Sequence, residues 1–238
     1  MERWHLPPTY ALIRKRFGAQ QERIARESIR SALDRQEFAS YHYTEVVRLK
    51  RGYERRYLTS NLLIDLHGQD GHKRRDAFER FIVKVGAHAI ATVQSLHAIP
   101  DVLAHALHYA TGANLAPRPM ASRSISARTV ASSLQKDVHF KSLSSLLAGT
   151  QSSTTWSHLS ALSNLAKHRS VIRTALNEDF TGTRKELREV HFKSCEYDGA
   201  FFPAISLQAL LEPAYDQLMT STLSIGHELT SCLRREAA

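Results

Sequence analysis

The sequence is poor in cysteine, glycine and proline, and these scarcities exclude several classes of protein. Among its 238 residues there are only 2 Cys, 10 Gly and 7 Pro, whereas 42% are hydrophobic. Cys195 and Cys232 are too few for a disulfide framework, and their separation does not match a metal-binding pair. So apolar a chain, with so little Gly and Pro, can bury a core and is not extensively disordered. We therefore expect a folded protein of a reducing compartment, with one large domain or two small ones.

Long apolar runs are also missing. The best candidate for a membrane span, residues 83–110, is interrupted by Lys84, Asp101 and several histidines. The first five residues, Met-Glu-Arg-Trp-His, lack the apolar segment of a secretion signal. These observations predict a cytoplasmic protein with no membrane partner.

Acidic residues are scarce in the middle of the chain. The 32 Lys and Arg outnumber the 23 Asp and Glu, which gives a formal net charge of +9. Between Asp101 and Glu178 the sequence contains a single acid, Asp137. A positive field of this kind attracts polyanions without specifying their sequence. The charge therefore favours a nucleic acid or a phosphorylated ligand, although small basic proteins without such partners have similar compositions.

Apolar residues recur at helical spacing along most of the chain. The segment up to Phe17 is expected to form an arm or a short helix, and residues 68–71 and 114–126 a turn and a loop. The expected helices cover residues 20–37, 45–66, 76–99, 102–111, 130–147, 152–177 and 208–234.

The helical spacing of apolar residues ends after residue 179. Residues 187–197 alternate apolar and polar side chains, Asp198-Gly199 is a hairpin turn signal, and residues 200–205 complete a second strand. The sequence thus predicts an all-α fold, a helical bundle with long helices and a small β-hairpin before the C-terminal helix. We expect an N-terminal arm and helix over residues 1–40 and a helical domain over residues 41–238.

One stretch of the predicted helix 152–177 carries side chains suited to phosphate chemistry. Residues 164–169, Asn-Leu-Ala-Lys-His-Arg, are called the 164–169 motif below. Asn164 and His168 are four residues apart and share a helical face, with Lys167 and Arg169 on either side of the histidine. A histidine that titrates near neutral pH, an amide and two fixed cations can together handle a phosphodiester.

The same residues have a purely structural interpretation. His168 follows Leu165 by three positions and precedes Ile172 by four, so it is expected beside the buried stripe of the helix. It would then be a core histidine, hydrogen-bonded to Asn164 or to a backbone carbonyl. Its cationic neighbours would form a solvated edge. The sequence leaves both interpretations open.

An Asn-x-x-x-His element late in a helical chain, after a long helix such as residues 76–111, resembles the HEPN superfamily (higher eukaryotes and prokaryotes nucleotide-binding). The resemblance covers residues 40–235 and rests on this motif and the order of elements. Members are all-helical and commonly dimeric, and many are metal-independent ribonucleases. Their motif is often Arg-Asn-x-x-x-His; Asn164 and His168 match its last two fixed positions, whereas Ser163 replaces the Arg. The form Asn-x-x-Lys-His is similar to a divergent branch.

The resemblance implies a metal-independent ribonuclease of a toxin–antitoxin or antiviral-defence system. His168, Asn164, Lys167 and Arg169 would be its catalytic residues, with no cofactor or metal. Lys167 follows Ser163 by one turn and can replace the missing charge, but not the bidentate phosphate contact of Arg. The implied partners are RNA or a nucleotide, a second copy in a homodimer, and an antitoxin or sensor protein.

Two alternatives to a ribonuclease stay open. The first is a catalytically inactive HEPN-like scaffold that binds RNA, nucleotide or a partner protein through a basic face. The second is an ordinary helical protein with neither activity.

Weaker candidates come from the 13 histidines. The family motif is more generally an Arg, four to six residues and then a His. Arg35 with His42 and Arg184 with His191 also fit this spacing, which arises easily by chance. A metal site on the long helix would need a partner such as His67 or His72, so packing or surface roles are favoured. The histidines of that helix are His88, His97, His105 and His108, and His105 pairs in sequence with Asp101. The hairpin aromatics Phe192, Phe201 and Phe202 are expected to pack against the last helix.

Overall fold

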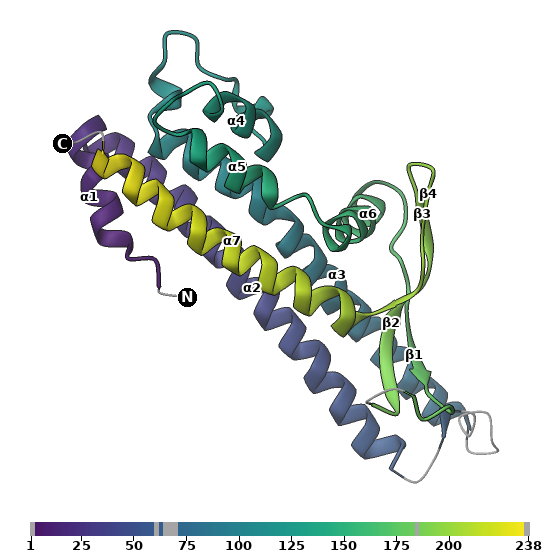
Figure 1. Ribbon diagram of the computed structural model, residues 1–238. Coiled ribbons are helices and arrows are strands. Elements are labelled where there is room, and N and C mark those ends of the chain that lie inside the picture. Colours follow the sequence, from purple (N-terminus) through teal and green to yellow (C-terminus); the bar gives the residue numbers. More distant parts are fainter. Residues whose placement is uncertain (1–2, 60–61, 64–70, 184–185, 236–238) are drawn as a thin grey trace. The chain divides into compact units, whose positions relative to one another are not determined.

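The computed structural model describes residues 3–59, 62–63, 71–183 and 186–235 (Figure 1). Helices make up 71% of the structure and are accompanied by short antiparallel strands, which confirms the mostly-α class. The described helices are α1 (Leu6–Phe17), α2 (Ala19–Tyr57), α3 (Gly71–Ala110), α4 (Ala127–Leu134), α5 (Lys141–Gly149), α6 (Thr154–His168) and α7 (Leu207–Arg235), with short 3₁₀ turns η2 (Ala113–Leu115) and η3 (Ser122–Ser124). The strands are β1 (Thr174–Glu178), β2 (Arg188–Phe192), β3 (Cys195–Tyr197), β4 (Ala200–Phe202) and β5 (Ile205–Ser206).

The chain divides into two compact units. The first unit comprises residues 1–37, 96–157 and 214–238, and the second comprises residues 38–95 and 158–213. The division expected from the sequence, at residue 40, stays a prediction. No helix in the described ranges is both long and apolar enough to cross a membrane.

In the first unit, α1 and the segment before it pack against α7. The Trp4 ring lies directly on Gly226, where a Cβ atom would overlap it. The Trp4 indole N–H donates to the Thr9 hydroxyl at 3.0 Å, and the Thr9 and Thr230 hydroxyls are hydrogen-bonded at 2.7 Å. The absence of a side chain at Gly226 is thus what allows the aromatic ring to reach α7.

The helix expected over residues 130–147 is wrong, because the first unit contains two helices there, α4 and α5, side by side. A capping box starts α4: the Ser126 hydroxyl accepts from the Thr129 N–H, and the Thr129 hydroxyl accepts from the Ser126 N–H. After α4 the Asp137 carboxylate accepts from the His139 N–H at 2.9 Å, a local bond typical of a turn. This turn competes with a continuous helix.

In the second unit, β1, β2 and β5 form an antiparallel sheet in the order β1-β2-β5. Glu178 and Arg188 are directly opposite in the β1–β2 register, and the Arg188 Nε donates to the Glu178 Oε1 at 2.6 Å. The Glu178 side chain is 2% exposed, and its second oxygen accepts from the Leu63 N–H at 2.9 Å. This buried pair favours the observed register, since a shifted pairing would separate the two side chains and leave buried charges uncompensated.

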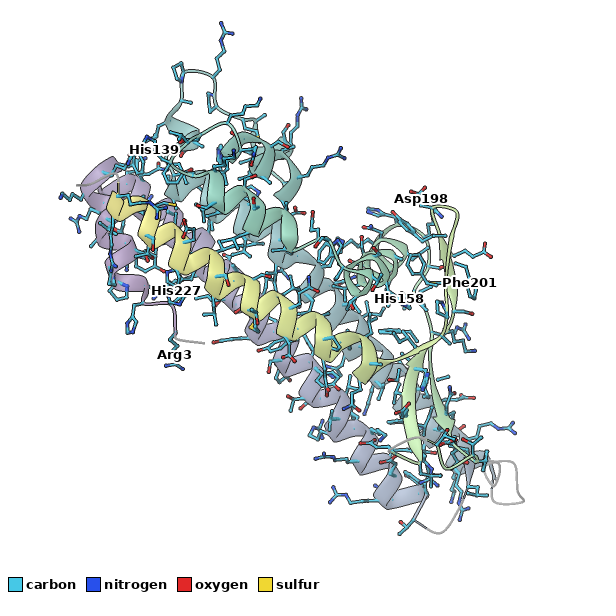
Figure 2. The ribbon with its side chains drawn as sticks, viewed as in Figure 1. Arg3, His139, His158, Asp198, Phe201 and His227 are labelled. Carbon is cyan, nitrogen blue, oxygen red and sulfur yellow. The ribbon has the colours of Figure 1, made fainter. Side chains whose placement is uncertain are left out.

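The predicted hairpin turn is confirmed, with β3 and β4 paired on either side of it. The expected strands 187–197 and 200–205 are shorter than predicted, because each is divided between this two-stranded sheet and the β1-β2-β5 sheet. Asp198 and Gly199 occupy the hairpin turn with φ values of 51° and 76°, as a type I′ connection requires. Asp198 lies at the tip of the hairpin in Figure 2.

The two longest helices, α2 and α3, are continuous where the sequence predicts interruptions. Residues 20–37 and 45–66 were expected as separate helices, but α2 is continuous and ends at Tyr57. Residues 76–99 and 102–111 are likewise expected as separate helices, but α3 is continuous and contains Pro100. The expected turn over residues 68–71 lies outside the described residues except for Gly71, where α3 begins.

Candidate functional site

The 164–169 motif lies at the C-terminal end of α6, not in the middle of a helix. The helix ends at His168, and the N–H groups of Arg169 and Ser170 both donate to the Leu165 carbonyl at 2.9 Å. The chain then enters β1 at Thr174. The predicted helix 152–177 is therefore wrong beyond residue 168.

Exposure rises steeply along the motif. Ser163 and Leu165 are buried, Asn164 is half-buried, and Lys167, His168 and Arg169 are exposed. The expectation that His168 lies beside the core is wrong, because α6 ends at His168, Ile172 is not on that helix, and the His168 side chain is exposed. The motif thus presents a histidine and two cations to solvent.

The side chains of the motif contact residues outside it. The Asn164 amide donates to the Ser160 hydroxyl at 3.3 Å, one turn towards the start of α6. Within the part of the chain that the structure describes, no hydrogen bond joins Asn164 to His168. The Arg169 guanidinium lies over the Tyr197 ring, 5.7 Å from its centroid, which connects the end of α6 to the β3–β4 hairpin.

Further cations lie in the segments that follow the motif. The Lys193 N–H donates to the Arg173 carbonyl at 3.1 Å, so these two exposed residues are on adjacent stretches of backbone. Lys167 lies in the last turn of α6, where its charge compensates the partial negative charge of the helix terminus. No sequence pattern identifies Lys193, because the pairing of β1 and β2 brings it there.

Ser163, which stands in place of the family arginine, is completely buried. Its hydroxyl oxygen has no hydrogen-bond partner in the described structure. A longer, charged side chain at this position would have to enter the core of the second unit. The exposed cation one turn later, Lys167, is therefore the one that faces solvent.

His158 is a second histidine of α6, and no motif in the sequence identifies it. It is 7% exposed, its Nε2 has no partner among the described residues, and its ring centroid lies 5.1 Å from that of Phe202 (Figure 2). Burial lowers the pKa of His158, so the imidazole is held neutral. Phe201 is 66% exposed, so the expectation that it packs against the last helix is wrong. Phe202 contacts His158 of α6, and its packing against the last helix stays a prediction.

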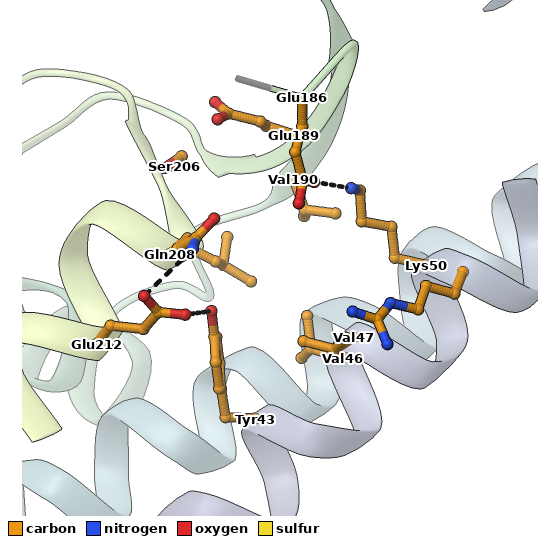
Figure 3. A pocket seen from close by; sticks show the side chains of 12 residues that line it. Tyr43, Val46, Val47, Lys50, Glu186, Glu189, Val190, Ser206, Gln208 and Glu212 are labelled. Carbon is orange, nitrogen blue, oxygen red and sulfur yellow. Dashed lines mark hydrogen bonds and ion pairs between the residues drawn. The ribbon is translucent and has the colours of Figure 1, made fainter. Parts of the chain in front are cut away.

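A cavity of about 150 Å³ in the second unit lies between α2, β2 and the start of α7 (Figure 3). The Tyr43 hydroxyl donates to the Glu212 carboxylate at 2.8 Å, and Gln208 donates to its other oxygen at 3.2 Å. Burial and this bond to Glu212 raise the pKa of Tyr43 well above its usual range. Lys50 forms an ion pair with Glu186 at the other side. These contacts join α2 to the start of α7 and to Glu186, just before β2.

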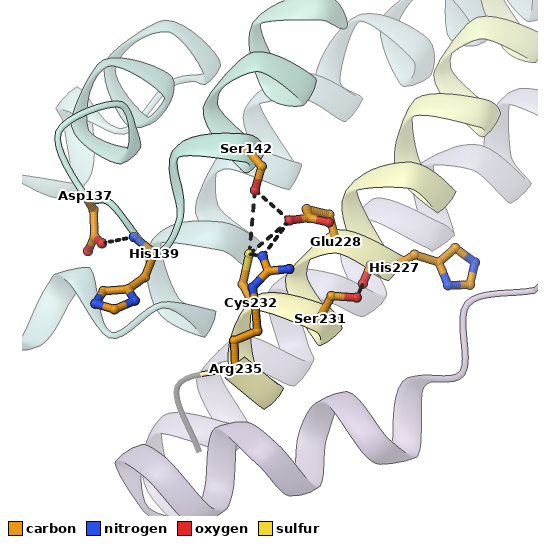
Figure 4. Close-up of polar contacts among 8 residues, drawn as sticks. All are labelled: Asp137, His139, Ser142, His227, Glu228, Ser231, Cys232 and Arg235. Atoms are coloured by element: carbon orange, nitrogen blue, oxygen red, sulfur yellow. Dashed lines mark hydrogen bonds and ion pairs between the residues drawn. The ribbon is translucent and has the colours of Figure 1, made fainter. Parts of the chain in front are cut away.

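A polar cluster in the first unit surrounds Glu228 (Figure 4). Its Oε1 accepts from the Ser142 hydroxyl at 2.6 Å, from Arg235 at 2.9 Å and from the Cys232 thiol at 3.3 Å. Burial raises the pKa of Cys232, which is 0% exposed. A protonated, inaccessible thiol is a poor nucleophile, so the cluster ties α5 to α7.

The other histidines of the sequence analysis have local partners. His42 Nδ1 lies 3.0 Å from His88 Nδ1, and His97 stacks on Trp156 with ring centroids 5.1 Å apart. Asp101 accepts from the Ala127 N–H at 2.9 Å. In the described ranges no group of three or more His, Cys, Asp or Glu residues is placed to hold a metal ion. Arg184, His67 and the side chain of His72 lie outside the described residues.

Comparison with known proteins identifies no relative of this chain. No family model, no curated protein and no solved structure matches this chain. The functional assignment therefore depends on the residues and contacts of the chain itself.

Proposed function

We propose that the protein is a HEPN-like, metal-independent ribonuclease that acts at the exposed end of α6. The observation that supports this proposal is the exposure of Lys167, His168 and Arg169 in succession, with the Tyr197 ring beside Arg169. Two fixed cations can hold the non-bridging oxygens of a phosphodiester, and an aromatic ring can stack on an unpaired base.

The proposed reaction is an internal transfer of the phosphoryl group. His168, in its neutral form, removes the proton from a 2′-hydroxyl, and the oxygen attacks the adjacent phosphorus. The bond from phosphorus to the 5′-oxygen then breaks, and this leaving oxygen takes up a proton. The products carry a 2′,3′-cyclic phosphate and a 5′-hydroxyl. Lys167 and Arg169 stabilise the negative charge that develops on the phosphoryl oxygens.

The two proton transfers motivate the second part of the proposal. Each chain contributes one exposed histidine at this site, so a homodimer would supply a base from one copy and an acid from the other. We also propose a helical-bundle fold of the HEPN type, a cytoplasmic location, and an antitoxin or sensor protein that restrains the activity.

The test is digestion of a single-stranded RNA in the presence of EDTA. We expect cleavage by the wild type, and a loss of about 10²-fold or more in the His168→Ala variant, because general acid–base catalysis contributes on that order. The control is His139→Ala, which removes an exposed histidine in the first unit and should leave the rate unchanged. Undiminished cleavage by His168→Ala would contradict the proposal.

A catalytically inactive RNA-binding scaffold is the second candidate. Two observations favour it: the buried Ser163 in place of an arginine, and the Asn164 amide that is bonded to Ser160 and not to the histidine. This candidate predicts salt-dependent RNA retention without cleavage. The plot of log affinity against log salt concentration has a negative slope, and a Lys167→Gln/Arg169→Gln variant should reduce the magnitude of that slope by about 1.4. A Lys136→Gln/Lys141→Gln variant, with the same net charge, should not.

A further inference from the structure

A basic cleft lies between α1 and α2 in the first unit, which does not contain the 164–169 motif. Its volume is about 470 Å³, within the range of small-molecule sites. Glu22, Arg26 and Arg30 follow one another at four-residue intervals, so they line one face of α2. From α1, Tyr10 and Arg14 face them across the cleft.

The charges of this cleft are only partly compensated. The Arg26 Nε donates to the Glu22 carboxylate at 2.6 Å, which pairs one cation with the one acid of the lining. Arg14 and Arg30 are exposed. Among the described residues, neither guanidinium group has a hydrogen bond or an ion pair. The cleft therefore carries two guanidinium charges in excess over its carboxylate.

Tyr10 provides a second, independent sign of an unfilled site. Its side chain is 7% exposed, and its hydroxyl has no hydrogen-bond partner in the described ranges. The Arg26 guanidinium lies over the ring, 4.5 Å from the centroid. Burial raises the pKa of Tyr10, and the charges of Arg26 and Arg30 oppose this effect, so both cations act on the hydroxyl. A buried polar group without a partner costs free energy, which a bound oxygen or water would recover.

We propose that the α1–α2 cleft binds a phosphomonoester dianion. The two unpaired guanidinium groups match its charge of about −2, and their planar donors suit the geometry of phosphate oxygens. A phosphodiester within a nucleic-acid chain carries only one negative charge and fits less well. The dianion is supplied either by a small phosphorylated molecule or by the phosphorylated end of an RNA.

The test uses inorganic phosphate first, titrated calorimetrically into the full-length protein at about pH 8 and constant ionic strength. We expect saturable binding, weakened about tenfold or more in the Arg14→Gln/Arg30→Gln variant. The matched control is Lys15→Gln/Arg23→Gln, which removes two exposed cations from the same two helices but outside the cleft, and should bind phosphate as the wild type does. All four side chains are exposed, so the variants should unfold at the temperature of the wild type.

A second arm identifies the source of the dianion. One RNA oligonucleotide is compared in its 5′-phosphorylated and 5′-hydroxyl forms. A preference for the phosphorylated form that disappears in Arg14→Gln/Arg30→Gln assigns the cleft to an RNA end. Equal affinities, together with specific phosphate binding, assign it to a small phosphorylated molecule. Absence of saturable phosphate binding, or an equal loss in the control variant, would overturn the proposal. Since His168 is untouched, failure here leaves the ribonuclease assay unaffected.

Discussion

His42 and His88 face each other through their Nδ1 atoms, 3.0 Å apart, and Tyr41 lies edge-on to both rings. A hydrogen bond at this distance needs one nitrogen to donate and the other to accept, so the pair cannot be doubly protonated without repulsion. Burial and the neighbouring imidazole lower the pKa of His42, although Glu45 opposes them. The folded state therefore disfavours protonation of His42.

The pair makes stability depend on pH with a definite sign. Because the pKa of His42 is lowered on folding, the unfolded chain binds more protons, and stability falls as the pH drops below about 6.5. His158 and His108, whose pKa values burial also lowers, act in the same direction. Urea unfolding at about pH 7.5 and 5.5 should show this loss. The loss should be smaller in His42→Asn, which keeps a hydrogen-bonding atom near the Nδ1 position, than in the exposed control His5→Asn. A loss as large in His42→Asn as in the wild type would contradict the argument.

At the scale of elements, sequence patterns predicted the parts that local chemistry determines. Asp198-Gly199 identified the hairpin, because its turn needs two positive φ angles and few residues adopt them. The 3.6-residue period of apolar residues located α3 and α7, because one face of each helix is buried. Both patterns depend on residues close in the sequence and not on contacts with distant segments.

The end of α6 was missed because two patterns overlap there. Ile172 and Leu176 continue the helical period by coincidence, but residues 171–174 include the β-branched Val171, Ile172 and Thr174, which favour a strand. The antiparallel pairing of β1 with β2, from Thr174 opposite Phe192 to Glu178 opposite Arg188, decides the outcome. The exposure of His168 followed from this boundary, so neither it nor the contact of Arg169 with Tyr197 could be derived from spacing alone.

Gly226 offers a test of how α1 is held in the first unit. In a Gly226→Ala variant the new methyl group would overlap the Trp4 ring, so the ring must move and its packing on α7 is lost. We expect a destabilisation of about 1–3 kcal/mol, measured by urea unfolding. Gly52→Ala is the control, because Gly52 is inside α2 with open space at its Cβ, and it should be neutral or stabilising by up to about 1 kcal/mol. An equal effect of the two substitutions would contradict this account of the Trp4 contact.

On the scale of the whole molecule, the net charge of +9 is the common basis of two functional proposals with different chemistry. The second unit presents Lys167, His168 and Arg169 for a phosphodiester that is to be cleaved. The first unit presents Arg14 and Arg30 for a terminal phosphate that is only bound. Each proposal has its own variant and its own readout, so either can fail while the other stands.

The most direct test of the central claim is the chemistry of the RNA ends after digestion in EDTA. The proposed role of His168 predicts 2′,3′-cyclic phosphate and 5′-hydroxyl ends from the wild type, because the 2′-hydroxyl is the nucleophile. These ends should be absent, or at least about 10²-fold fewer, with His168→Ala. Ends with a 5′-phosphate, or cyclic phosphates that persist in His168→Ala, would contradict the account.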